Sequence, residues 1–153
     1  MARARPILDQ LCRRVEHVGA AGAGAAMKLA VNLPTQVYWQ ALGEALSLCR
    51  PLNLDPVRLM DIFSDTSGAP KVLEHRGADI AAALGGKNMP SQNFTLDSVR
   101  KDLRTMLEEA QALGCKLPVV ERALECYDQA SREGLGATDC AIHPVIWSRR
   151  DGK

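Results

Sequence analysis

Residues 19–50 read GAAGAGAAMKLAVNLPTQVYWQALGEALSLCR, a glycine-rich turn followed by a long run that suits a helix. Its apolar side chains occupy more than one helix face: Met27, Val31, Tyr38, Leu42, Ala45, Leu46 and Cys49. Apolar side chains on most sides are typical of a helix buried among other helices. The run therefore predicts a long central helix from residue 23 to about 50. Pro34 removes one backbone N–H and collides with the preceding turn, which predicts a kink after Asn32.

Within this run a lysine and an asparagine lie four positions apart. Positions i and i+4 share one helix face, so the ammonium of Lys28 and the amide of Asn32 are expected to point into the same space. Three glycines precede the pair, Gly19, Gly22 and Gly24, and they leave bare backbone that a ligand can approach closely. Such a pair alone is typical of a solvated helix face. Together with the glycines it indicates a site for an oxygen-rich anion.

Proline, glycine and capping residues predict the remaining helices. They are expected over 56–63 with Asp55 as N-cap, over 70–84 before Gly85 and Gly86, from Leu96 to the stop at Gly114, and over 118–130 before Gly134. A turn at 64–68, a polar loop at 87–93, and a last short helix capped by Thr138 and disturbed by Pro144 complete the prediction. No segment of this span alternates with the period of a half-buried strand, so the sequence predicts an all-α fold.

The first eighteen residues follow a different pattern. Residues 4–12 suit one or two helical turns, and residues 14–18, RVEHV, are short and β-branched enough for a strand. A lone strand leaves its backbone donors and acceptors unpaired, so the rest of its sheet is expected to lie outside this chain.

Composition argues against several classes of protein. The 153 residues fit one domain, and 19 basic against 18 acidic residues give a net charge of +1, which is too little to hold a nucleic acid.

The five cysteines include no C-x-x-C pair, and His17, His75 and His143 have no partner at metal or triad spacing, so no metal site is expected. Cys115 and Cys126 are expected to be inert core thiols. No apolar run has the length of a membrane span or signal peptide, and a cytoplasmic location is the default expectation.

Three groups of residues together resemble one enzyme family. They are HVGAAGAGAAMKLAVN at 17–32, Phe94-x-Leu96-x-x-x-x-Lys101-Asp102-Leu103, and a closing pattern of Gly114-Cys-Lys-Leu-Pro118, Tyr127 and Gly134-x-Gly136-x-x-Asp139. In this order they resemble the β-hydroxyacid dehydrogenases, the family of 3-hydroxyisobutyrate dehydrogenase, tartronate semialdehyde reductase and 6-phosphogluconate dehydrogenase. The resemblance covers residues 4–142. The chain departs from the family pattern at Pro34, where related enzymes usually continue an unbroken helix.

The resemblance implies an N-terminal Rossmann domain that binds NAD or NADP, followed by an all-α domain. Residues 1–18 would be the last helix and strand of the Rossmann domain, 19–148 the substrate-binding and dimerisation domain, and 149–153 a frayed tail. The chain has no G-x-G-x-x-G turn inside a βαβ unit, so the main dinucleotide site is expected on a domain absent from it. The chain alone is therefore expected to show no turnover.

The resemblance also assigns roles to individual residues. Lys28 would be the general acid/base of hydride transfer between a nicotinamide and a small hydroxy acid or its semialdehyde. The substrate-binding residues would be Asn32, Lys101 and Gly24, and the cofactor-binding residues would be Phe94, Lys101 and Asp102. Family members commonly form dimers or tetramers through this domain, so a homodimer or homotetramer is expected.

Each assignment has an alternative. Taken alone, Lys101 and Asp102 are an ordinary charged helix surface, and Phe94 is a core anchor. The whole domain has an alternative too, a helical oligomerisation module that keeps the fold without chemistry.

Overall fold

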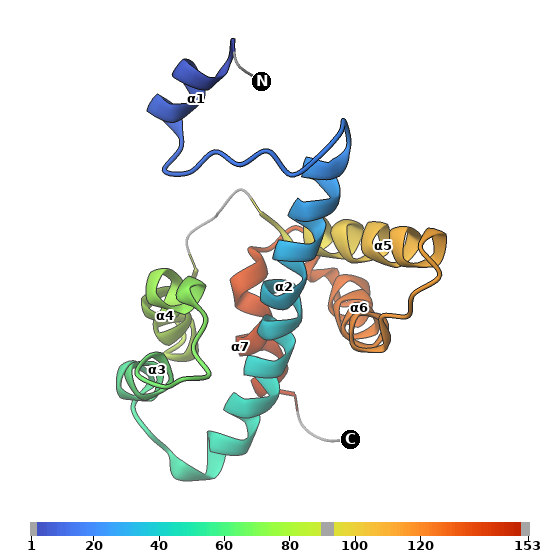
Figure 1. Cartoon of the computed structure of the whole chain (residues 1–153). Helices are drawn as coiled ribbons and strands as arrows, with labels where there is room; N and C mark the ends of the chain where they lie inside the picture. The colour runs from blue at the N-terminus through green and yellow to red at the C-terminus, as the bar shows by residue number, and fades with distance from the viewer. Residues whose placement is uncertain (1–2, 90–93, 151–153) are drawn as a thin grey trace. The chain divides into compact units, whose positions relative to one another are not determined.

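The computed structural model describes residues 3–89 and 94–150, and helices joined by turns and loops make up this part of the chain (Figure 1). The α-helices are α1 Arg5–Leu11, α2 Ala23–Cys49, α3 Pro56–Ser64, α4 Lys71–Leu84, α5 Leu96–Ala112, α6 Pro118–Ala130 and α7 His143–Ser148. Two 3-10 turns cover Arg50–Leu52 and Cys140–Ile142, and a π-helical turn covers Ser131–Leu135. Within the described ranges no residue belongs to a strand, and one antiparallel bridge joins Thr95 to Asp139. The predicted all-α fold is confirmed.

The chain divides into two compact units, residues 1–32 and 33–153, and each is described by itself. In the first unit, the helix expected near residues 4–12 forms as α1, with a proline in its first turn. The strand expected at 14–18 does not form, because the described part of the chain offers it no partner strand. Gly19 and Gly22 have φ angles of +142° and +96°, which glycine tolerates, and they form the turn from which α2 starts.

In the second unit, α3 pairs with α4 and α5 pairs with α6 (Figure 1). The later part of α2 contacts α6 and α7. The hydroxyl of Tyr127 on α6 donates to the carbonyl of Gln36 on α2 at 2.9 Å. Gly43 lets α7 approach, since a Cβ added there would lie 2.7 Å from Cβ of Trp147. The buried residues of α2 all lie in this later part: Gln36, Trp39, Gln40, Leu42, Gly43 and Leu46.

The earlier part of α2 differs from its prediction. Met27 is 49% exposed and Val31 is 64% exposed, so the expected burial on most sides is wrong for this segment. Helix α2 continues without a break through Pro34. The kink after Asn32 stays a prediction.

Most predicted helix ends agree with the structure. The carboxylate of Asp55 accepts the backbone N–H groups of Val57 and Arg58, both at 3.0 Å, as an N-cap does. Gly86 and Gly114 have φ angles of +88° and +68° just after α4 and α5, which explains why those helices stop there.

The last helices begin differently from the prediction. Asp139 is the N-cap, because its carboxylate accepts the N–H of Ala141 at 2.9 Å. Thr138, the predicted cap, instead donates its hydroxyl to the carbonyl of Leu135 at 2.6 Å. Pro144 was expected to disturb the last helix, but it lies in the first turn of α7. Proline suits this position, because the backbone N–H groups of the first turn have no partner within the helix.

The chain end is held more firmly than expected. Arg149 donates to the carbonyls of Ala83 and Leu84 at 2.7 and 3.2 Å, and Arg150 pairs with Glu133 at 2.6 Å. The predicted frayed tail therefore excludes residues 149 and 150. Residues 151–153 and part of the predicted 87–93 loop, residues 90–93, lie outside the described residues.

Candidate functional site

Lys28 and Asn32 lie on the first turns of α2, four positions apart as the sequence predicts. Lys28 is exposed, and within the described residues it makes no hydrogen bond or ion pair, while Asn32 is half-buried. An ammonium without a protein partner is available to a ligand. The backbone before it is open as well, because a Cβ added at Gly22 or Gly24 would meet nothing within 4 Å.

Lys101 and Asp102 lie on α5 in the second unit. Lys101 is exposed and has no polar partner among the described residues, like Lys28. Asp102 is half-buried, and its Oδ2 accepts a hydrogen bond from Nε2 of Gln36 at 3.2 Å. The side chain of Asp102 therefore faces α2, and Lys101 projects from a different side of α5.

Phe94 directly precedes Thr95, the N-cap of α5, whose hydroxyl accepts the N–H of Ser98 at 3.2 Å. The carbonyl of Phe94 accepts the N–H of Cys140 at 3.0 Å, which holds its backbone to the start of the last helices. Its ring is 40% exposed, so the alternative of a core anchor is wrong. A ring left in the open is available for contact with another molecule or domain.

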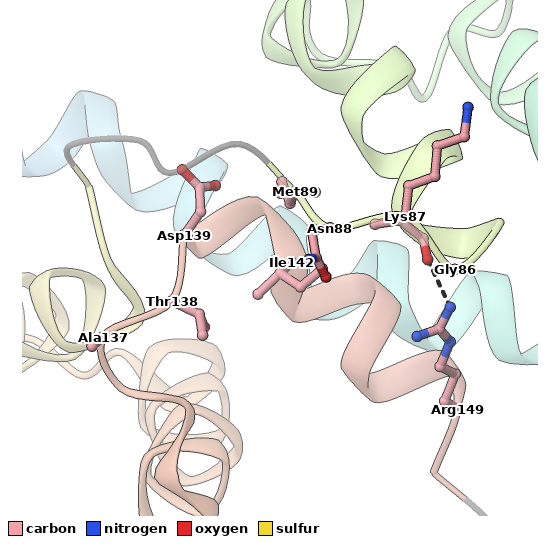
Figure 2. A pocket seen from close by; sticks show the side chains of 10 residues that line it. Gly86, Lys87, Asn88, Met89, Ala137, Thr138, Asp139, Ile142 and Arg149 are labelled. Carbon is pink, nitrogen blue, oxygen red and sulfur yellow. Dashed lines mark hydrogen bonds between the residues drawn. The ribbon is translucent and has the colours of Figure 1, made fainter.

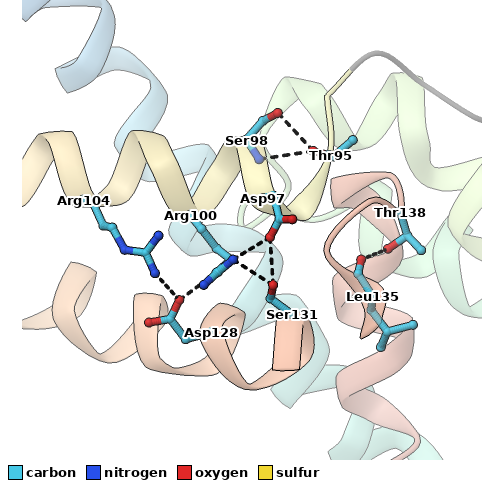
Figure 3. A network of polar contacts seen from close by, with 9 residues as sticks. All are labelled: Thr95, Asp97, Ser98, Arg100, Arg104, Asp128, Ser131, Leu135 and Thr138. Atoms are coloured by element: carbon cyan, nitrogen blue, oxygen red, sulfur yellow. Dashed lines mark hydrogen bonds and ion pairs between the residues drawn. The ribbon is translucent and has the colours of Figure 1, made fainter. Parts of the chain in front are cut away.

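A polar network fixes the start of α5 against α6 (Figure 3). Arg100 donates to Asp97 at 2.6 Å, to Ser131 at 2.7 Å and to Asp128 at 2.7 Å, and Arg104 reaches the same oxygen of Asp128 at 2.7 Å. Hydrogen bonds from Arg100 and Ser131 hold the pKa of the Asp97 carboxyl below its usual value. Single exposed pairs contribute little free energy, but a shared network restricts how the helices turn.

The network and the Gln36 contact were not predicted. Asp97, Asp128 and Gln36 follow no motif, and their partners lie up to 66 positions away in the sequence. Asp139 belongs to the closing motif but was given no role, and it pairs with Arg76 at 2.5 Å while it caps the last helices.

A cavity of about 550 Å³ lies between the end of α4 and the segment before α7 (Figure 2). Arg149 lines it and reaches toward the C-terminal end of α4, and Asp139 lines the opposite side. None of the predicted site residues lines this cavity. The residues expected to bind substrate and cofactor therefore do not form this cavity.

The histidines and cysteines fall into distinct surroundings. His17 and His75 are exposed, and His143 is fully buried with Nε2 2.6 Å from Oε1 of Gln40. Cys126 is a buried thiol as predicted, and burial raises its pKa, whereas Cys115 is exposed because it lies in the open turn after α5. Among residues 3–89 and 94–150 no three His, Cys, Asp or Glu side chains gather as a metal site would require.

The predicted residues thus form two groups. Gly24, Lys28 and Asn32 belong to the first unit, and Phe94, Lys101 and Asp102 belong to the second. Each group presents one lysine without a polar partner among the described residues.

A family model described as the NAD-binding domain of NADP-dependent 3-hydroxyisobutyrate dehydrogenase matches residues 22–145, more than half of the chain. The chain belongs to this family. The match corresponds to the helical C-terminal domain of these NAD(P)-dependent hydroxyacid dehydrogenases, and the resemblance expected from the motifs is confirmed.

Curated members of the family are similar over nearly the whole chain. A 2-(hydroxymethyl)glutarate dehydrogenase of Eubacterium barkeri is 28% identical over 97% of this chain and 48% of its own length. A 3-hydroxyisobutyrate dehydrogenase of Pseudomonas aeruginosa is 29% identical over 88% of this chain and 47% of its own length. The chain therefore spans about half the length of these relatives.

Solved structures share the fold. The 3-hydroxyisobutyrate dehydrogenase of Salmonella typhimurium superposes with a TM-score of 0.83 at 25% identity, over 95% of this chain and 50% of that one. No helix in the described part of the chain combines the length and apolarity needed to cross a lipid bilayer.

Proposed function

We propose that this chain supplies the substrate-binding and catalytic helical half of an NAD(P)-dependent dehydrogenase that acts on a small hydroxy acid or its semialdehyde. The observation that carries the proposal is the exposed ammonium of Lys28, which has no polar partner among the described residues and lies four positions before Asn32. Lys71 is also exposed and has no polar partner among the described residues, so the neighbouring amide of Asn32 and the open backbone at Gly24 are what set Lys28 apart.

In this proposal Lys28 acts on a proton of the substrate. NAD or NADP, when bound, supplies the acceptor or donor of the hydride. As the hydride leaves the carbinol carbon, the neutral amine form of Lys28 takes the hydroxyl proton and becomes an ammonium, and in the reverse direction the ammonium returns that proton to the carbonyl oxygen. The amide of Asn32 can donate and accept hydrogen bonds, so it orients the substrate without adding charge.

The described residues can supply only part of a binding site for a dinucleotide. They include no strand, so they cannot form the strand-to-helix turn that cradles a pyrophosphate. The half-exposed ring of Phe94 and the exposed Lys101 are suited to contact the nicotinamide end and the substrate anion. The rest of the cofactor site belongs on a Rossmann domain outside this chain, and the choice between NAD and NADP is made there.

The test uses the enzyme with its Rossmann domain and follows NADH or NADPH oxidation with three- and four-carbon semialdehydes. Lys28→Met should lower kcat by roughly 10²- to 10⁴-fold, the usual contribution of a general acid/base. The control is Lys71→Met, which removes an exposed lysine from the start of α4 and should leave kcat unchanged. Unchanged turnover in Lys28→Met would overturn the proposal.

A second candidate is the helical oligomerisation module. The observation that favours it is the exposure of Met27 and Val31 on the same helix as Lys28, because apolar side chains on an open face favour association with a second copy. Light scattering would show whether the chain forms the expected dimer or tetramer. Assembly combined with full activity of Lys28→Met would favour the module.

A further inference from the structure

Gln36 is a buried polar residue at the meeting point of three helices. It lies on α2 and is 3% exposed. Its backbone carbonyl accepts the hydroxyl of Tyr127 from α6 at 2.9 Å, and its side-chain Nε2 donates to Oδ2 of Asp102 on α5 at 3.2 Å. Through these two bonds one residue connects α2 to both α5 and α6.

The orientation of the Gln36 amide is determined by its partner. An ionised carboxylate only accepts hydrogen bonds, so the NH₂ group must face Asp102. Oε1 then points elsewhere, and it is buried without a hydrogen-bond partner among the described residues. An unpaired buried carbonyl oxygen costs free energy that methionine or leucine at this position would avoid. Packing alone therefore gives no reason for glutamine here.

The bond to Asp102 is one of two anchors that flank Lys101 on α5. Successive helical residues are turned by about 100°, so Arg100 and Asp102 leave the helix on either side of Lys101. Arg100 is anchored to Asp128 at 2.7 Å on one side (Figure 3), and Asp102 is anchored to Gln36 on the other. Lys101 has no polar partner of its own among the described residues, so its direction follows the rotation of α5, which the buried apolar face of the helix and these two anchors set together.

We propose that Gln36 is a positioning residue, whose hydrogen bond to Asp102 fixes the rotation of α5 and thereby aims the ammonium of Lys101 at the anion it binds. This inference rests on the proposed function, in which Lys101 contacts substrate or cofactor. It adds a residue that lies outside the family motifs quoted above.

The test measures anion binding at individual lysines of the 153-residue chain. Its six lysines are converted to ¹³C-dimethyl-lysines, which keep their charge, and each NMR signal is assigned through a Lys→Arg variant. Oxalate is the probe, as a small dicarboxylate. In the unaltered chain the Lys28 and Lys101 signals should shift with oxalate, while that of Lys71 should not.

Gln36→Met removes the anchor and should weaken oxalate binding at Lys101 by roughly fivefold, the effect of misdirecting one charged contact. Gln40→Met is the matched control. Gln40 is also buried on α2 and hydrogen-bonded, but to His143 and Glu44, away from α5. Its variant should leave oxalate binding at Lys101 unchanged. Equal weakening in both variants would mean that general loosening is responsible and would overturn the inference.

Gln36→Glu gives a readout that loss of packing would not mimic. A protonated glutamic acid can donate to Asp102 as glutamine does, whereas an ionised one repels it. Binding at Lys101 should therefore approach that of the unaltered chain at about pH 5.5 and be at least as weak as in Gln36→Met at about pH 8. The same affinity at both values would overturn the inference.

The outcomes also separate the two proposals. If neither Lys28 nor Lys101 responds to oxalate in the unaltered chain, the anion contact that the proposed function assigns to these two lysines is overturned. If Lys101 responds equally with and without Gln36, only the positioning role is overturned.

Discussion

The imidazole of His143 lies almost parallel to the ring of Tyr127, with centroids 3.9 Å apart and planes inclined by 17°. Both residues are fully buried. Gln40 donates its amide NH₂ to Glu44 at 2.8 Å, so its Oε1 must accept from Nε2 of His143 at 2.6 Å. Nδ1 of His143 is buried without a partner among the described residues. The site therefore holds a neutral imidazole with its proton on Nε2.

Acid should destabilise the chain through His143. Burial, and then the positive charge of Arg150, lower the pKa of His143 from 6.5 to about 3. Below pH 6.5 His143 takes up a proton in the unfolded chain but stays neutral in the folded chain. The contribution of the buried neutral imidazole to stability is therefore complete above pH 6.5 and is lost as pH falls toward 3. The loss is at most about 1.4 kcal/mol per pH unit. Urea unfolding between about pH 7.5 and 5 should thus show a loss of about 2 kcal/mol from this group.

Two histidine variants isolate that contribution. His143→Gln cannot titrate, so its stability should depend less steeply on pH, even though the substitution itself destabilises the fold. His75→Gln removes an exposed imidazole and should keep the original pH dependence. A slope in His143→Gln equal to that of the unaltered chain would mean that the folded state already accepts the proton.

Gly43→Ala should destabilise the fold by about 1–3 kcal/mol through overpacking. The added Cβ would lie 2.7 Å from Cβ of Trp147 and 3.0 Å from Cα of Pro144, so α2 and α7 must move apart. Gly24→Ala is the matched change on the same helix. It enters open space and should leave the free energy of unfolding unchanged or raise it by up to about 1 kcal/mol.

The same Gly24→Ala variant also tests the predicted substrate contact. Since its methyl group disturbs no packing in this chain, a higher KM in the enzyme with its Rossmann domain would come from the ligand side. An unchanged KM would remove Gly24 from the candidate site.

Local signals in the sequence predicted the helices well. Asp55 before a proline, and glycines after α4 and α5, act within one turn of their own position, so pattern alone locates them. Thr138 and Asp139 are adjacent and both are of residue types that commonly cap helices. The sequence alone therefore does not show which of them is the N-cap, and the backbone angles decide it. Asp139 has ψ of 139° and its carboxylate faces the open N–H groups.

The candidate site was predictable only in part. Lys28 and Asn32 share a motif and one helix, so their proximity follows from spacing. The partner of Asp102 is Gln36, 66 positions away, and no periodicity connects two residues at that separation. Such contacts depend on how helices pack, which a helical pattern does not specify.

Gly136→Ala should cost about 1 kcal/mol, because the partners it displaces are partly exposed. Gly136 has ordinary helical angles, so backbone strain is not the cause. Its added Cβ would lie 2.6 Å from Cγ of Asp97, and the carboxylate would have to leave Arg100 and Ser131. In an Asp97→Ala background the obstacle is gone, so the two changes together should cost less than their sum. Strict additivity in urea unfolding would contradict this account.

Lys101 should affect substrate affinity more than turnover. It is proposed to attract anions and not to exchange protons, so Lys101→Met in the enzyme with its Rossmann domain should raise KM by roughly tenfold and change kcat far less. Lys101→Arg keeps the charge and should restore part of the affinity, because both side chains attract an anion although their shapes differ. Higher salt should narrow the difference between Lys101→Met and the unaltered enzyme, since ions screen an exposed charge. A fall in kcat as large as that of Lys28→Met, with KM unchanged, would instead assign Lys101 to the proton-transfer step.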